Sequence, residues 1–205
     1  PGWNGGFNAF FGVASGWAIR SSRDNTFLGI NAGMFLDNGS GNVFIGTDAG
    51  RAGSDPGTWV PRAYTASNNT FIGTSSGYFN YEGDNNVAIG HSAGASLQTG
   101  TGNVFLGYTA GSEEVGSNKL YITNQTLDGD DNPITPLLYG DFSTHQLGIN
   151  STSLTATLNV GGSAYVSGNL SAGSITAPIS GNVTGNLPGN VTGDVNGNLT
   201  GNVTG

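Results

Sequence analysis

Short apolar segments recur along the first half of the chain, and each is followed by glycine. Six of them share the pattern Asn-x-(Phe/Ala)-(aliphatic or Phe)-Gly-x-x-(Ala/Ser)-Gly. The six segments start at Asn8, Asn25, Asn42, Asn69, Asn86 and Asn103. The distances between successive starts are 17, 17, 27, 17 and 17 residues. The long step equals one 17-residue period plus a ten-residue insertion. β-Branched and aromatic residues favour a short strand in each segment, and the Asn, Asp and Gly residues between them favour turns. The chain is therefore predicted to be a repeat protein.

Alternation makes both faces of each predicted strand apolar. In Asn42-Val-Phe-Ile-Gly46, Val43 and Ile45 share one face and Phe44 points the opposite way. Strands that are apolar on both faces are typical of parallel or stacked arrangements. We expect a β-roll, or β-helix, that coils once per repeat. One strand face would line its interior and the other would meet neighbouring subunits.

The glycine after each strand has a steric interpretation. It is expected where the backbone needs a positive φ or approaches another segment closely, because only glycine does either without strain. A nucleotide-binding interpretation of Gly-x-x-x-Gly is disfavoured, since no lysine follows and no helix is signalled. These structural glycines are Gly12, Gly29, Gly46, Gly73, Gly90 and Gly107.

Between Ser117 and Val160 the repeat stops and a connector of four short strands is predicted. The segment Asp128-Gly-Asp-Asp-Asn-Pro133 marks the turn between the first two strands. The predicted strands are Lys119–Thr123, Leu137–Tyr139, Gln146–Ile149 and Ala156–Val160.

A second repeat, of four residues, fills the C-terminal part. Its unit is Gly-(Asn/Asp)-(Val/Leu)-(Thr/Asn/Pro), as in Gly181-Asn-Val-Thr184. Collagen is excluded, because it needs glycine at every third residue. In an extended strand, Val and Gly share one face, so a single chain cannot bury itself. Three intertwined chains can, which predicts a triple-stranded β shaft and a homotrimer.

The expected architecture is all-β and falls into three parts. Residues 1–116 form the β-roll, with an insertion at about 51–64, residues 117–160 the connector, and residues 161–205 the shaft. Because the chain begins at Pro1 and stops within a four-residue repeat, we expect it to be truncated at both ends.

Composition narrows the function. Charged residues make up 9 % of the chain, against roughly 25 % in an ordinary domain. A net charge of −8 argues against a nucleic-acid partner, which requires clustered Lys and Arg. No apolar run is long enough for membrane insertion. There is no cysteine, so no disulfide is expected.

Candidate sites are few, and no cofactor or catalytic residue is expected. The insertion carries Trp59, Arg62 and Tyr64, residue types enriched where proteins bind partners, so receptor contact is one interpretation and a structural flap the other. Three carboxylates that lie close together in the sequence form a weak candidate for a Ca²⁺ site, and a solvated turn is the alternative interpretation. They are Asp128, Asp130 and Asp131. His91 and His145 lack neighbouring ligands in the sequence, so no metal site is expected there.

Two families resemble these segments over residues 7–111. Asn85-Asn-Val-Ala-Ile-Gly90 resembles the head repeat of trimeric autotransporter adhesins. Phe-bearing segments such as Asn69-Thr-Phe-Ile-Gly73 resemble repeats of bacteriophage and prophage tail fibre proteins, and similar tetrads occur in phage fibre shafts. Both resemblances imply trimeric parallel β-rolls, although the 17-residue period is longer than the usual adhesin coil.

The resulting hypothesis is a non-enzymatic, structural segment of a phage or phage-like tail fibre, extracellular and part of a virion. It would be a homotrimeric rod that acts as a spacer. Presenting sites that bind the host surface would be a further, adhesive role. Its partners would be other tail, baseplate or fibre proteins and a host cell-surface glycan or protein. The alternative is a head and stalk segment of a trimeric autotransporter adhesin on the bacterial outer surface.

Overall fold

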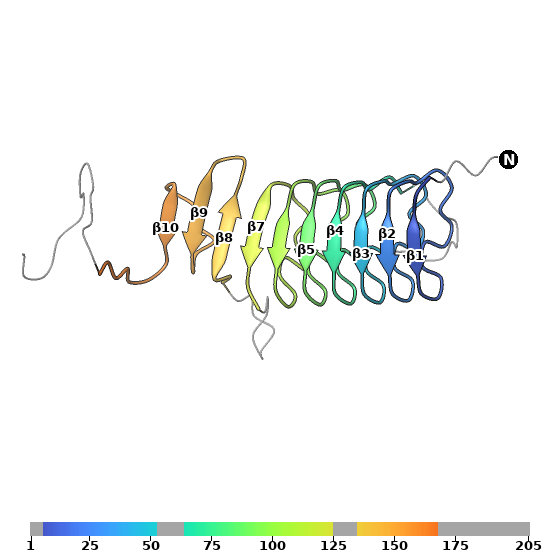
Figure 1. Ribbon diagram of the computed structural model, residues 1–205. Helices are drawn as coiled ribbons and strands as arrows, with labels where there is room; N and C mark the ends of the chain where they lie inside the picture. Colours follow the sequence, from blue (N-terminus) through green and yellow to red (C-terminus); the bar gives the residue numbers. More distant parts are fainter. Residues whose placement is uncertain (1–5, 53–63, 125–134, 168–205) are drawn as a thin grey trace, which may run out of the picture. The chain divides into compact units, whose positions relative to one another are not determined.

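The computed structural model describes residues 6–52, 64–124 and 135–167 of the chain. These residues contain ten short strands in one sheet, whose spatial order follows the sequence from β1 to β10 (Figure 1). Over the same residues, no helix is long and apolar enough to cross a membrane. The strands are Ala9–Phe11 (β1), Thr26–Leu28 (β2), Val43–Ile45 (β3), Thr70–Ile72 (β4), Val87–Ile89 (β5), Val104–Leu106 (β6), Lys119–Ile122 (β7), Leu138–Asp141 (β8), Gln146–Ile149 (β9) and Leu158–Val160 (β10).

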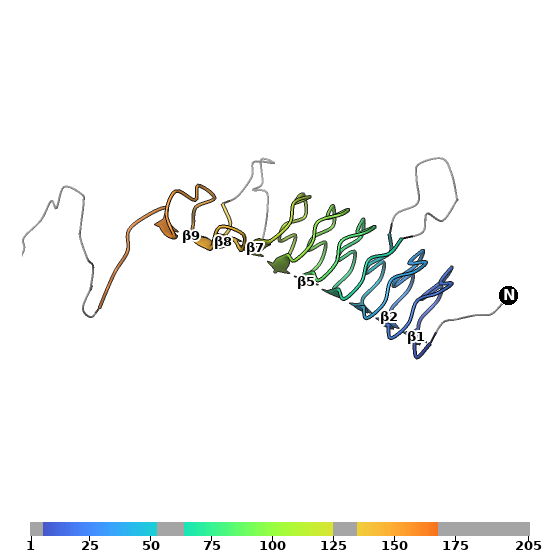
Figure 2. The same ribbon diagram turned by 90° about the horizontal axis from the view of Figure 1, so that it is seen from above.

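Strands β1 to β6 are the rungs of a parallel β-solenoid with one coil per repeat. Each strand pairs in parallel with the next, and equivalent repeat positions are in register, as in Phe10 with Phe27 and Phe27 with Phe44. Seen from above, the coils stack one behind another with their strands along one side (Figure 2). The predicted all-β repeat architecture with a 17-residue period is therefore confirmed for this part of the chain.

The interior is a column of stacked phenylalanine rings. Phe27, Phe44 and Phe71 are at most 1 % exposed. The ring centroids of Phe27 and Phe44 are 4.8 Å apart and those of Phe44 and Phe71 are 5.0 Å apart, with rings 6° from parallel. Each such pair contributes about 0.5–1.5 kcal/mol beyond the burial of its area. The third strand position thus lines the interior, and the second and fourth positions point outward.

A second column, of buried asparagines, closes each coil. The Nδ2 of Asn42 donates to Oδ1 of Asn25 (3.0 Å) and to the carbonyl oxygen of Ala66 at the end of its own coil (2.9 Å). Its backbone N–H donates to the same Oδ1 of Asn25 (2.9 Å). The Oδ1 of Asn42 in turn accepts from N and Nδ2 of Asn69 (2.9 and 3.2 Å). One amide therefore joins three coils and satisfies both of its own polar atoms.

The ten-residue insertion leaves this closure unchanged. Ala66 lies 24 residues after Asn42, whereas Gly39 lies 14 residues after Asn25, yet both carbonyl groups accept from the ladder asparagine of their own coil. Strand β4 also stays in register with β3. The repeat therefore resumes after the insertion without a shift of register.

The glycine after each strand meets both steric expectations. At Gly46, φ is 135°, and an added Cβ would lie 2.6 Å from the carbonyl carbon of Gly73 in the next coil. A second glycine, four residues later, makes room for the interior ring. Gly33 has a φ of 62°, and a Cβ there would collide with the Phe27 ring of its own coil. Both glycines are thus required by packing and by backbone conformation.

Ala88 interrupts the phenylalanine column, and the next ring fills the space. An added Cβ at Gly94, in the Ala88 coil, would lie 2.7 Å from the Phe105 ring of the following coil. An added Cβ at Gly111 would lie 2.5 Å from the same ring. Phe105 therefore occupies interior space in two coils and is fully buried.

The sheet continues beyond the solenoid. β7 is parallel to β6, β8 runs antiparallel to both β7 and β9, and β10 is parallel to β9. The four strands predicted between residues 117 and 160 are all present, with boundaries shifted by up to two residues. The described residues from 6 to 165 belong to one compact unit. The predicted four-residue shaft from Gly181 lies outside the described residues and stays a prediction, as does the three-part division of the chain.

The asparagine ladder is testable at its centre. Asn69→Ala removes the acceptor for the buried N–H of Asn86 and the donor to Asn42. Since each unsatisfied buried polar group costs about 1–3 kcal/mol, we expect unfolding free energy to fall by roughly 3–5 kcal/mol. Urea unfolding followed by circular dichroism measures it. The control is Asn38→Ala, at an exposed turn, and equal effects of the two changes would contradict the ladder's role.

The filled space beside Ala88 gives a second prediction. The repeat pattern alone suggests that Ala88→Phe would stabilise the protein by completing the column. We expect instead a loss of about 1–3 kcal/mol, because Phe105 already occupies that space and overpacking forces rings from their preferred positions. Thermal unfolding of the two proteins tests this, and an unchanged or raised midpoint would show that the space is vacant.

Candidate functional site

The outward face of the sheet is apolar along its whole length. The fourth strand position forms one row that the register carries through all ten strands. Its members are Phe11, Leu28, Ile45, Ile72, Ile89, Leu106, Ile122, Leu138, Ile149 and Val160. The second position forms a parallel row without charge. Its members are Ala9, Thr26, Val43, Thr70, Val87, Val104, Leu120, Gly140, Leu147 and Leu158. We call the two rows together the outer face.

One copy of the chain leaves this face open to solvent. Leu28 is 45 % exposed, Ile89 40 % and Leu158 56 %. None of the large side chains of the outer face is buried. Monomeric proteins seldom expose contiguous apolar patches larger than a few hundred Å², and larger patches mark interaction sites. The outer face is therefore the strongest candidate for a functional surface.

The turn that follows each strand widens the same surface. The residue after each structural glycine is exposed, as in Ile30 and Tyr108, about half exposed each. His91 occupies this position in the fifth coil and stacks on Tyr108, with ring centroids 5.3 Å apart. Its exposure and aromatic partner give His91 a surface packing role. Over the described residues, no group of three or more His, Asp or Glu side chains is arranged to hold a metal ion.

A hollow of about 840 Å³ lies where the outer face passes from the solenoid to the antiparallel strands. Leu106, Ile122 and Leu137 form its apolar part, and Thr123 and Asn150 are among its polar residues. It opens beside the fourth-position row, so it belongs to the same surface. None of the described residues that line it is charged.

Of the three residues predicted from the sequence to contact a receptor, one lies in the part of the chain that the structure describes. Tyr64 is 3 % exposed, and its ring stacks on Tyr81 at 5.1 Å, so its side chain belongs to the interior and leaves little for a receptor to contact. Trp59 and Arg62 lie outside the described residues. The Ca²⁺ candidates Asp128, Asp130 and Asp131 also lie outside them.

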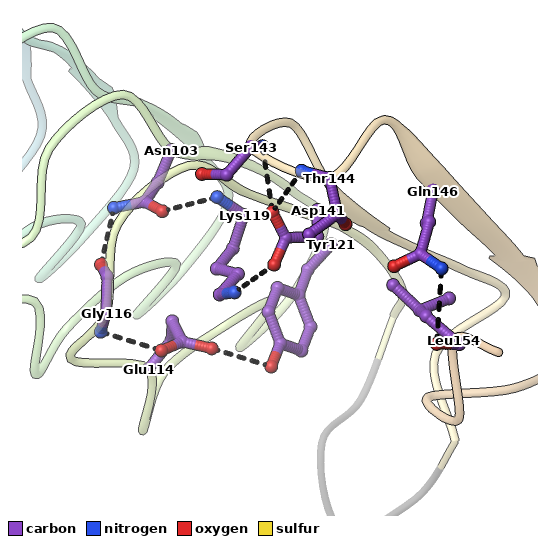
Figure 3. Close-up of polar contacts among 10 residues, drawn as sticks. All are labelled: Asn103, Glu114, Gly116, Lys119, Tyr121, Asp141, Ser143, Thr144, Gln146 and Leu154. Atoms are coloured by element: carbon purple, nitrogen blue, oxygen red, sulfur yellow. Dashed lines mark hydrogen bonds and ion pairs between the residues drawn. The ribbon is translucent and has the colours of Figure 1, made fainter. Parts of the chain in front are cut away.

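A polar cluster at the reversal of strand direction was not predicted from the sequence (Figure 3). Lys119 Nζ lies 2.6 Å from Asp141 Oδ2 and joins β7 to β8. The Oδ1 of Asp141 accepts from the backbone N–H groups of Ser143 (2.8 Å) and Thr144 (3.2 Å), which fixes the following turn. Nearby, the Tyr121 hydroxyl donates to Glu114 Oε2 (2.8 Å).

The electrostatics of this cluster indicate a structural clamp. The hydrogen bond from Lys119 lowers the pKa of Asp141, and the same bond raises the pKa of Lys119. Burial, followed by the hydrogen bond to Glu114, raises the pKa of Tyr121. At neutral pH the carboxylate is therefore ionised and the amine protonated. A protonated amine is not a nucleophile. The contact between Lys119 and Asp141 is therefore an ion pair that holds β7 to β8.

Comparisons with protein-family models, with curated proteins and with solved structures find no match for this chain.

The clamp makes stability depend on pH in a defined direction. Because the pKa of Asp141 is lowered on folding, its contribution is present above the ordinary Asp pKa of about 3.9 and is lost as pH falls through the lower folded value. The contribution of Lys119 is present below its ordinary pKa of about 10.4 and is lost as pH rises through the raised value. Asp141→Asn keeps the turn acceptor but should flatten the acid part of the profile.

Urea midpoints measured between about pH 5 and pH 2 test this prediction. Asp24→Asn is the matched control, since Asp24 is exposed and has no ion pair in the described part of the chain. Identical acid profiles of the two variants would show that the ion pair contributes nothing.

Proposed function

We propose that this chain is a structural segment of a homotrimeric fibre of the phage or phage-like tail fibre type, without enzymatic activity. Three copies pack through their outer faces, and the resulting rod spaces and presents host-attachment sites at the surface of a virion. The observation that carries the proposal is the unbroken, uncharged outer face. Its partners are two further copies of the chain, other fibre or tail proteins, and a host-surface glycan or protein.

The dimensions of the outer face suit a shared interface. Ten strands about 4.8 Å apart extend for roughly 45 Å, and two rows of side chains give an apolar area on the order of 500 Å². Such an area lies in the upper part of the range of roughly 300–600 Å² for the largest apolar patch of a monomer, a patch that is often functional. In a threefold arrangement each copy contacts two others, so one face serves both contacts.

The internal column of rings explains why oligomerisation is compatible with a stable coil. Phe44 and Asn42 are buried within one chain, so the coil closes without help from a neighbour. The rows that point outward, such as Ile45 and Ile89, take no part in that closure. Association through these rows therefore places copies of the chain side by side without changing how the coils of each copy fold.

The Phe-bearing coils support the tail fibre type over the adhesin type. Five of the six repeat segments carry Phe at the third position, and Ala88 is the exception that resembles the adhesin head. A fibre of this kind attaches by avidity, because three copies present identical weak sites on one rod.

Sedimentation equilibrium tests the assembly. We expect a particle of three times the 20.7 kDa chain mass. Ile89→Asp places one charge per copy in the interface, and its desolvation should raise the concentration at which the trimer dissociates at least about tenfold. Far-UV circular dichroism of the monomer should be unchanged, since Ile89 points outward.

Thr99→Asp is the control, because Thr99 is exposed in the turn before Asn103 and lies off the outer face. It should leave the association unchanged. A stable folded monomer of the unaltered chain at high concentration would refute the trimer, and equal weakening by both variants would move the interface away from the outer face.

A further inference from the structure

One exposed asparagine lies between β2 and β3 and takes no part in the ladder. Asn38 donates its backbone N–H to Tyr64 O (3.0 Å). Its side-chain amide has no hydrogen-bond partner among the described residues. The ladder residue Asn42 is different, because its amide is buried and both of its polar atoms are bonded. The Asn38 amide is therefore free in solvent, whereas the ladder amides are protected.

The residue that follows Asn38 is Gly39, whose backbone nitrogen is also free. Over the part of the chain that the structure describes, the Gly39 N–H makes no hydrogen bond. Glycine has no Cβ to crowd this nitrogen. Among the described asparagines, Asn38 is the only one followed by glycine. An unbonded amide and an unhindered nitrogen thus lie next to each other along the chain, so a reaction between them is intramolecular.

Exposure alone does not produce this arrangement. Asn68 and Asn85 are exposed as well, but each precedes a ladder asparagine. The N–H of Asn69 donates to Asn42 Oδ1 (2.9 Å), and the N–H of Asn86 donates to Asn69 Oδ1 (2.9 Å). The nitrogen that follows these two exposed asparagines is therefore hydrogen-bonded, and the residue that carries it has a Cβ.

We propose that Asn38 is a site of spontaneous covalent modification, at which the side-chain amide becomes a carboxylate through a cyclic imide. The Gly39 nitrogen bonds to Cγ of Asn38 as the Cγ–Nδ2 bond breaks, and ammonia leaves with the proton of that nitrogen. Water then opens the ring. Addition of water at Cγ gives aspartate in an ordinary backbone. Addition at the main-chain carbonyl carbon gives isoaspartate, whose main chain runs through Cβ.

The packing around Gly39 makes the isoaspartate product unfavourable for the fold. Gly39 O accepts from Asn25 Nδ2 (3.0 Å), and this bond closes the second coil. An added Cβ at Gly39 would lie 2.0 Å from Ala66 O, so this glycine is in close contact with the end of the next coil. Isoaspartate adds one atom to the main chain ahead of Gly39, and the closing carbonyl group must shift to accommodate it. The modification therefore weakens the closure of one coil.

The new carboxylate also lies beside a carboxylate with few partners. The Asp37 side chain is 4 % exposed, and its Oδ2 is 3.3 Å from Nη1 of Arg20, whose side chain is 65 % exposed. The Oδ1 of Asp37 is buried without a hydrogen-bond partner. A second negative charge on the neighbouring residue is therefore repelled. Both products change the charge, and only isoaspartate changes the backbone. This inference rests on the fold and stands apart from the proposed trimer.

The test follows each asparagine of the full, folded chain during incubation at mildly alkaline pH. Mass spectrometry of the digested protein measures conversion, and chromatography separates aspartate from isoaspartate peptides. We expect Asn38 to convert at least about tenfold faster than Asn85, because only Asn38 has a free, unhindered nitrogen after it. The rate should rise with pH, since the attacking nitrogen must lose its proton. Urea unfolding should give a lower midpoint for the incubated protein than for fresh protein.

Two variants separate the reaction from its consequences. Asn38→Gln keeps an amide but would need a six-membered ring, which forms more slowly, so its midpoint should not fall during incubation. Asn38→Asp carries the new charge on an ordinary backbone, and its midpoint should lie between those of the fresh and incubated proteins. If Asn38 converts no faster than Asn85, or converts only after unfolding in urea, the modification site is refuted. An equal fall of the midpoint in incubated Asn38→Gln would refute the effect on coil closure.

Discussion

The buried asparagine ladder is the constraint on which the rest of the solenoid depends. Backbone hydrogen bonds join each coil to its neighbours, as from Gly33 N–H to Ala49 O, and the asparagine amide adds a bond from the start of a coil to its own end, as from Asn42 to Ala66 O. The side-chain amide supplies the closure, because Asn42 binds the coil before it, the coil after it and the end of its own coil. Buried amides are costly when unpaired and specific when fully paired. Register is therefore set by the ladder, and the strands follow it.

The tight turn of each coil can form only because two glycines remove steric obstacles. Gly46 lets adjacent coils approach at their backbones, and Gly33 lets a phenylalanine ring lie against the turn of its own coil. Between such glycines the chain also holds non-glycine residues at positive φ, such as Asp48 at 56° and Thr109 at 53°. A left-handed conformation costs L-residues about 1–2 kcal/mol. The bonds between coils offset this cost in every repeat.

The sequence was sufficient to predict the period and the strands, because Asn and Gly mark every coil. It did not decide which strand face lies inside, since both are apolar. The second glycine of each repeat carried that information: only an inward ring needs the space that Gly33 leaves beside Phe27. The Lys119–Asp141 clamp was unpredictable for another reason. Its partners are 22 residues apart, and no repeat fixes how β8 registers on β7.

The outer face persists where the solenoid ends, and this follows from strand geometry rather than from the repeat. Side chains alternate between the two faces whether neighbouring strands are parallel or antiparallel. Leu138 on β8 therefore aligns with Ile122 on β7 even though the chain direction has reversed. Conserving the apolar row across this reversal requires an aliphatic residue at each new register position, although no asparagine ladder constrains those strands. Coil closure does not require such a row, whereas the proposed packing of copies through the outer face does.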